Sequence, residues 1–136
     1  MHLDFGVAWK YLPFLLQAAR LTIALTVLSQ ALGTAAAFFL ALARMSPRAW
    51  LRRPTIAYIW VVRGTPLLLH LFFVYYAAPA FGLTLDAFPA AIIAMSASAA
   101  AYNAEIIRAG LQAVHHGQVE AGYAVGMRYG QVVRRI

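Results

Sequence analysis

The chain has 136 residues, of which 63% are hydrophobic and 11% charged, with eleven Lys and Arg against four Asp and Glu. A soluble domain averages about 45–50% apolar and about 25% charged residues, so this composition excludes both a soluble domain and a disordered chain. The absence of cysteine excludes a disulfide scaffold, and a net charge of +7 in so apolar a chain fits a nucleic-acid binder poorly. An integral membrane protein remains.

The first segment, residues 1–20, lacks the basic start and short apolar core of a signal peptide, because Asp4 stands near its beginning. Residues 5–20 predict an amphipathic lead-in at the membrane interface, with Trp9 and Tyr11 as interfacial aromatics. The alternative is that this segment extends the first membrane span.

Three uncharged runs follow, and each has about the 18 to 23 residues that a helix needs to cross the hydrocarbon layer. Backbone groups in lipid must be satisfied internally, which favours helices. The sequence therefore predicts an all-α membrane protein with three transmembrane helices, near residues 21–43, 65–79 (entered from Tyr58) and 89–107. The small residues of 94–101 predict a face where helices approach closely.

Nine of the eleven basic residues fall on one side of these spans: Arg44, Arg48, Arg52, Arg53, Arg63, Arg108, Arg128, Arg134 and Arg135. By the positive-inside rule, the N-terminus lies outside and the C-terminal segment in the cytoplasm. The proline-containing linker 44–54 is then a cytoplasmic loop, and 78–88 is an external loop.

The chain lacks the residues of the simplest enzymes. Its one lysine, Lys10, follows no glycine-rich phosphate-binding loop, so ATP hydrolysis is not expected. No two histidines have the i,i+4 spacing of a helical metal site, and neither a metal nor a cofactor is predicted. His115 and His116 are expected in an exposed loop. His70 lies within a predicted span, where an ionisable residue is a functional candidate, although a neutral histidine bonded to a neighbouring helix is favoured.

Arg63-Gly64-Thr65-Pro66 stands at the start of the second span. Arg63 is expected near lipid phosphates, while Gly64 and Pro66 interrupt the chain and restart a helix that Thr65 caps. The alternative is an ordinary interfacial helix start.

A second motif occupies residues 117–130 and predicts a helix around 118–125, a turn at Gly126 and another short helix. Glu120 is expected in the first turn, where its charge suits the helix dipole. Two such helices need a partner that covers their apolar residues Val119, Tyr123 and Met127. The alternative is a helix that lies flat on the membrane.

This second motif resembles the EAA loop of bacterial ABC-transporter permeases, which reads Glu-Ala-Ala, three residues, Gly, nine residues, Ile, one residue, Leu-Pro. Glu120, Ala121, Gly126 and Ile136 occupy matching positions, and Gly122 replaces the usual second alanine. Arg63 to Pro66 and the segment from Tyr102 to Gly110 resemble the polar amino-acid subfamily, which handles His, Glu, Gln, Arg and opines. The resemblance runs from about Leu12 to Ile136.

The resemblance implies part of a five-span importer permease that carries polar amino acids across the bacterial inner membrane. Residues 112–136 would be its cytoplasmic EAA loop, and residues 117–126 would couple it to a separate ABC ATPase, through Gly117, Glu120, Ala121, Gly122, Gly126 and Ile136. A second permease subunit, identical or different, and a periplasmic or lipid-anchored amino-acid-binding protein would complete the importer. The protein itself would not be an enzyme.

The same family pattern places two further spans after the EAA loop, so the chain is expected to be a fragment or a truncated reading frame. The alternatives are a small three-span membrane protein with a structural or regulatory role, or a non-functional permease fragment. Glu105 and Arg108 have the i,i+3 spacing of a helix-surface ion pair, at the path lining or, as favoured, at the membrane interface. Asn103 is the candidate for a polar group facing the path.

Overall fold

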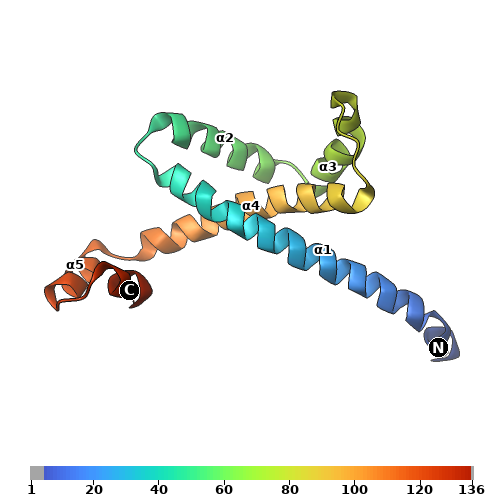
Figure 1. The fold of residues 1–136 in the computed structure, drawn as a ribbon, viewed down its shortest axis with the longest axis horizontal. Coiled ribbons are helices and arrows are strands. Elements are labelled where there is room, and N and C mark those ends of the chain that lie inside the picture. Colours follow the sequence, from blue (N-terminus) through green and yellow to red (C-terminus); the bar gives the residue numbers. More distant parts are fainter. Residues whose placement is uncertain (1–4, 136) are drawn as a thin grey trace.

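The computed structural model describes residues 5–135, which form helices joined by short turns (Figure 1). The elements are α1 (Phe5–Met45), α2 (Ala49–Gly64), α3 (Leu67–Phe72), the π-helix η1 (Phe73–Ala77), the 3₁₀ helix η2 (Ala78–Phe81), α4 (Ala87–Ala113), α5 (His116–Ala124) and α6 (Tyr129–Arg135). The predicted all-α membrane fold is confirmed. Two helices are long and apolar enough to cross a membrane, and a bent pair makes a third if it counts as one span.

Helix α1 is continuous across the boundary that the sequence suggested near residue 20. At a rise of about 1.5 Å per residue its 41 residues extend about 60 Å, twice the thickness of the hydrocarbon layer. The part of the lead-in from Phe5 onward and the first predicted span are therefore one helix, as in the alternative that the lead-in extends the span. The rest of the lead-in lies outside the described residues.

Helices α1 and α4 cross along their middle parts (Figure 1). Small residues form the seam between them. On α1 they recur at every fourth position, and all are buried: Ser29, Gly33, Ala37 and Ala41. On α4 the buried residues are also small: Ala90, Ala94, Ser98, Ala100, Ala101 and Ala104. Such spacing lets two helix backbones approach closely in a membrane. The close approach predicted for residues 94–101 is confirmed.

The second predicted span is not a straight helix. The segments Ala49–Gly64 and Leu67–Phe81 meet at an angle of 106°, with Thr65 and Pro66 between them. Proline has no backbone N–H and forces the residue before it toward extended geometry, which Thr65 adopts with φ −115° and ψ 142°. The predicted span 65–79 therefore lies after the bend, within Leu67–Phe81 apart from its first two residues, and the stretch from Tyr58 by which it was entered lies before the bend on α2.

Both predicted loops are shorter than expected. Helix α2 begins at Ala49, so only residues 46–48 separate it from α1, and most of the predicted loop 44–54 is helical. Pro54 lies in the second turn of α2. The predicted loop 78–88 contains η2 and the first residues of α4.

Helix α2 packs on the α1–α4 seam. Ile59 is buried against Ala37, Ala101 and Ala104, and the Tyr58 hydroxyl donates a 2.7 Å hydrogen bond to the carbonyl oxygen of Ala97. In the part of the chain that the structure describes, α5 and α6 pack only on each other, at the end of α4 (Figure 1). The fold is thus a helical body with a projecting helix pair.

Candidate coupling and translocation site

A tight turn joins the projecting helices α5 and α6, and Gly126 makes it possible. Its φ is +81°, in the left-handed region that non-glycine residues avoid. The Gly126 N–H donates to the Tyr123 carbonyl at 3.0 Å, and the Met127 N–H donates to the Gly122 carbonyl at 3.0 Å. These two bonds form a Schellman motif, which satisfies carbonyls at the end of α5. The predicted helix, turn and helix are confirmed.

The helix pair has a small buried interior and an apolar exterior. Gly122 and, on α6, Val132 are buried, while Val119 and Met127 are partly buried. Three large apolar side chains of the pair are exposed: Tyr123 at 47%, Val125 at 74% and Tyr129 at 74%. Gly122, which replaces the alanine of the family motif, therefore lies at the interior of the pair.

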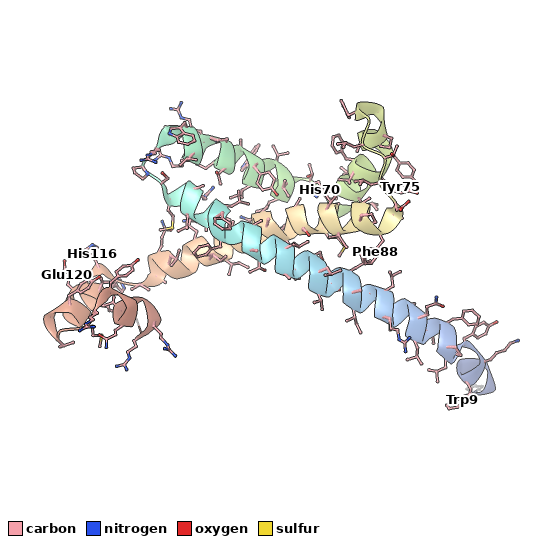
Figure 2. All side chains as sticks on the ribbon, viewed as in Figure 1. Trp9, His70, Tyr75, Phe88, His116 and Glu120 are labelled. Carbon is pink, nitrogen blue, oxygen red and sulfur yellow. The ribbon has the colours of Figure 1, made fainter. Side chains whose placement is uncertain are left out.

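Glu120 is exposed and lies on α5 beside His116 (Figure 2). The Nδ1 atom of His116 is 3.2 Å from Glu120 Oε1, one helical turn away. Because α5 begins at His116, Glu120 is in the second turn, and its placement in the first turn was wrong. The prediction that His116 lies in a loop was also wrong, while His115 precedes the helix as expected.

Of the other predicted coupling residues, Gly117 and Ala121 are exposed on α5. The position that a Cβ would take on Gly117 has no atom within 4 Å. Ile136 lies outside the described residues.

The motif from Arg63 to Pro66 forms the break between α2 and α3. Gly64 ends α2 and Pro66 precedes α3 without a side-chain cap. The Thr65 hydroxyl lies 3.0 Å from the carbonyl oxygen of Val61 and 2.5 Å from His70 Nε2. Thr65 therefore does not cap α3, as had been predicted, and instead bridges the break.

His70 lies at the junction of α3 with the helical body (Figure 2). Its partner is Thr65 at the break, whereas the sequence favoured a bond to a neighbouring helix. Its other ring nitrogen, Nδ1, is buried without a hydrogen-bond partner among the described residues.

A groove of about 800 Å³ runs between α2 and α4. Its polar lining comes from Arg44, Arg63, Thr65, Tyr102 and Glu105, and its apolar lining includes Ile56, Ile59 and Trp60. The Arg63 guanidinium lies over the Tyr102 ring at 5.2 Å from the centroid, within the range of a cation–π contact. Arg63, the first residue of the motif that resembles the polar amino-acid subfamily, thus lines the groove.

Glu105 is held by two arginines from two helices. Arg108 Nη2 lies 2.9 Å from Glu105 Oε2, which confirms the predicted i,i+3 pair. Arg44 Nε, from the end of α1, lies 2.8 Å from Glu105 Oε1, at an angle outside that of a hydrogen bond, so this contact is an ion pair. Arg44 was missed because only the crossing of α1 and α4 brings it to Glu105.

Asn103 connects α4 to α1. Its Nδ2 donates to Thr34 Oγ1 at 2.9 Å and to Gln30 Oε1 at 3.3 Å. Gln30 and Thr34 lie near the middle of the uncharged run of α1 and are exposed. The sequence offered one signal for them, the presence of polar residues at i and i+4 within an apolar helix.

The fold and these contacts define a helical membrane protein with a polar groove and a projecting helix pair. Within residues 5–135, no three His, Asp or Glu side chains are grouped so that they could hold a metal ion. Residues 31–136 match the family described as the binding-protein-dependent transport system inner membrane component. The chain belongs to this family.

Several relatives are transport permeases. The chain is 45% identical over 130 residues to the L-cystine transport system permease protein TcyB of Bacillus subtilis (strain 168), covering 96% of this chain and 56% of the relative. It is 38% identical to the arginine transport system permease protein ArtQ of the same organism, covering 98% and 62%. It is 40% identical to the octopine transport system permease protein OccM of Rhizobium radiobacter, covering 100% and 59%. These names describe membrane subunits of transport systems and not enzymes.

A solved structure described as an amino acid ABC transporter with histidines has the same fold. The TM-score is 0.84 at 39% sequence identity, and the match covers 98% of this chain and 63% of that chain. The chain therefore spans about three-fifths of the length of the proteins that it matches.

Proposed function

We propose that the chain forms part of the permease subunit of an ATP-driven importer for polar amino acids in the bacterial inner membrane. Family membership and the cystine, arginine and octopine systems of the relatives support this proposal. Because the chain has no phosphate-binding loop, a separate ABC ATPase would hydrolyse the ATP.

One observation carries the proposal, namely the helix pair α5–α6 that packs on no other described helix. Its exposed apolar side chains Tyr123, Val125 and Tyr129 favour a partner that covers them. We assign this surface to the ATPase. Residues 117–126 would be the coupling segment, with Gly117, Glu120 and Ala121 exposed toward the partner and Gly122 and Gly126 shaping the helix pair. Ile136 occupies the isoleucine position of the family motif.

The polar contacts within the helical body suggest where the translocation path runs. Asn103 would face the path, because amide and hydroxyl groups near the middle of an apolar helix are costly against lipid and favourable against water or substrate. The break from Arg63 to Pro66 would position α3 beside the path. A second permease subunit would close the path, and an external amino-acid-binding protein would supply the substrate.

The junction where α1 ends and α2 begins is rich in arginine, which supports a cytoplasmic location for this junction and an N-terminus on the outside. Arg48, Arg52 and Arg53 are exposed beside Trp50, which is also exposed. We expect these side chains to contact anionic lipid headgroups, because basic residues next to a membrane helix attract them.

Replacement of Gly126 tests the coupling assignment. In the complete permease, Gly126→Val should abolish capture of the ATPase in a pull-down, because a β-branched residue cannot adopt a φ of +81° without strain. Gly126→Asn should retain capture, since asparagine tolerates this conformation, and so should Gly130→Ala on α6, where a Cβ meets no atom within 4 Å. Unchanged capture by Gly126→Val would refute the assignment and favour a structural or regulatory three-span protein.

A further inference from the structure

Glu105 is the one described carboxylate that two arginines hold. Arg44 reaches Glu105 from α1, whereas Arg108 lies on α4 together with Glu105. Each arginine contacts a different oxygen of the carboxylate. The Glu105 side chain is 15% exposed, so water screens these contacts less than it screens pairs on an open surface. Arg108 also donates to the side chain of Gln112, which lies in the last turn of α4.

The position of this cluster along the chain is informative. Arg44 is the penultimate residue of α1, and Glu105 to Gln112 cover the final turns of α4. Helix α5 starts at His116, shortly after α4 ends at Ala113. Since α5 and α6 contact no other described helix, a displacement of the pair reaches the helical body through the end of α4.

Beyond Ala41 and Ala104 the small-residue seam between α1 and α4 offers no further buried apolar residue toward α5. Ile107 is only partly buried, and the Arg44–Glu105 pair is the last polar contact between the two helices before the projecting pair among the described residues. The Arg44–Glu105 ion pair resists separation of α1 from α4, because separation would leave the Arg44 guanidinium without its carboxylate in a partly buried place. Arg108, on the same helix as Glu105, holds the other carboxylate oxygen and so fixes the side chain that Arg44 contacts.

We infer, on the basis of the proposed function, that Arg44 and Arg108 are positioning residues that make the ends of α1 and α4 move together when the ATPase moves α5. Through the short linker 46–48 the same movement reaches α2 and the break at Thr65. The cluster would thereby determine how much substrate is transported for each ATP that the ATPase hydrolyses.

The test uses the complete permease assembled with its ATPase and binding protein in liposomes. The measured quantities are ATPase capture, ATP hydrolysis and substrate transported per ATP. Arg44→Glu should leave capture intact and lower transport per ATP about fivefold or more, the usual lower bound of a coupling effect. The triple reversal Arg44→Glu, Glu105→Arg, Arg108→Glu should restore it, because the alternation of charge returns.

Arg20→Glu is the matched control, since it makes the same charge change at an exposed residue of the same helix α1 that has no carboxylate partner within residues 5–135. It should transport normally. Arg44→Lys keeps the charge and should give an intermediate ratio in an assembled complex. Full transport per ATP in Arg44→Glu would overturn the inference, as would a loss of capture in parallel with transport in every cluster variant. Absence of ATPase capture by the unmodified permease would instead overturn the proposed function.

Discussion

At Gly33 the crossing helices leave no room for a side chain. A Cβ built there would lie 2.6 Å from Ala99 Cβ and 2.9 Å from the Ser96 carbonyl oxygen. The second of these atoms belongs to the backbone, so α1 and α4 must separate to accept even a methyl group. Gly33→Ala should therefore lower the stability of the helical body by about 1–3 kcal/mol, the usual cost of overpacking. The measurement is the thermal unfolding midpoint in detergent or nanodiscs.

Gly110 on α4 provides the control, because its Cβ position has no atom within 4 Å. Gly110→Ala should keep or raise the midpoint, since alanine favours a helix by about 1 kcal/mol over glycine. Equal midpoints for Gly33→Ala and Gly110→Ala would mean that the seam is looser than the structure shows.

Residue-scale contacts were predictable where helix geometry alone sets them. The Glu105–Arg108 pair follows from i,i+3 spacing on one helix, and the left-handed Gly126 follows from the glycine between two short helical patterns. Arg44 and the partners of Asn103 depend on where α1 crosses α4, which no local pattern states.

At the scale of elements, the positions of the charged residues predicted where the apolar helices lie, but not whether those helices are straight or where they begin and end. The Gly64 and Pro66 signal predicted a restart of the helix, and the structure adds a bend of 106°. We expect the size of that bend to depend on the bond between Thr65 and His70 and on the packing of α3 against α4, which no local pattern states. Continuity of α1 through residue 20 was hidden because Arg20 interrupts the apolar run without interrupting the helix.

The bridge between Thr65 and His70 should stabilise this break. Thr65→Val removes the hydroxyl and leaves His70 Nε2 unpaired, while His70 Nδ1 already has no partner among the described residues. An unsatisfied buried polar group costs about 1–3 kcal/mol, so the unfolding midpoint should fall. Spin labels placed on α2 and α3 should also report a broader distribution of distances across the break.

Thr22→Val serves as the comparison for that variant. Among residues 5–135, the Thr22 hydroxyl bonds only to the Ala18 carbonyl within its own helix, and Thr22 is exposed. Its loss should change the midpoint little. If Thr65→Val were as stable as Thr22→Val, with unchanged label distances, the bend would have to rest on Pro66 alone.

For the whole molecule, the bend leaves the number of membrane crossings as the central question of topology. A broken span carries the chain across the membrane, whereas a re-entrant segment returns it to the side from which it came. The two arrangements place the α1–α2 linker and the start of α5 differently. With a broken span both lie on the same side, and with a re-entrant segment they lie on opposite sides.

The absence of cysteine from the chain makes this difference measurable. We expect Pro47→Cys in the linker and His115→Cys before α5 to react with a membrane-impermeant maleimide only after the inner membrane is opened, because arginine-rich segments stay in the cytoplasm. Leu83→Cys, in the turn before α4, should react in intact spheroplasts. Each of these three positions is exposed, so burial would not hide the thiol. Labelling of Pro47→Cys and His115→Cys from opposite sides would establish a re-entrant segment and place the helix pair away from a cytoplasmic ATPase.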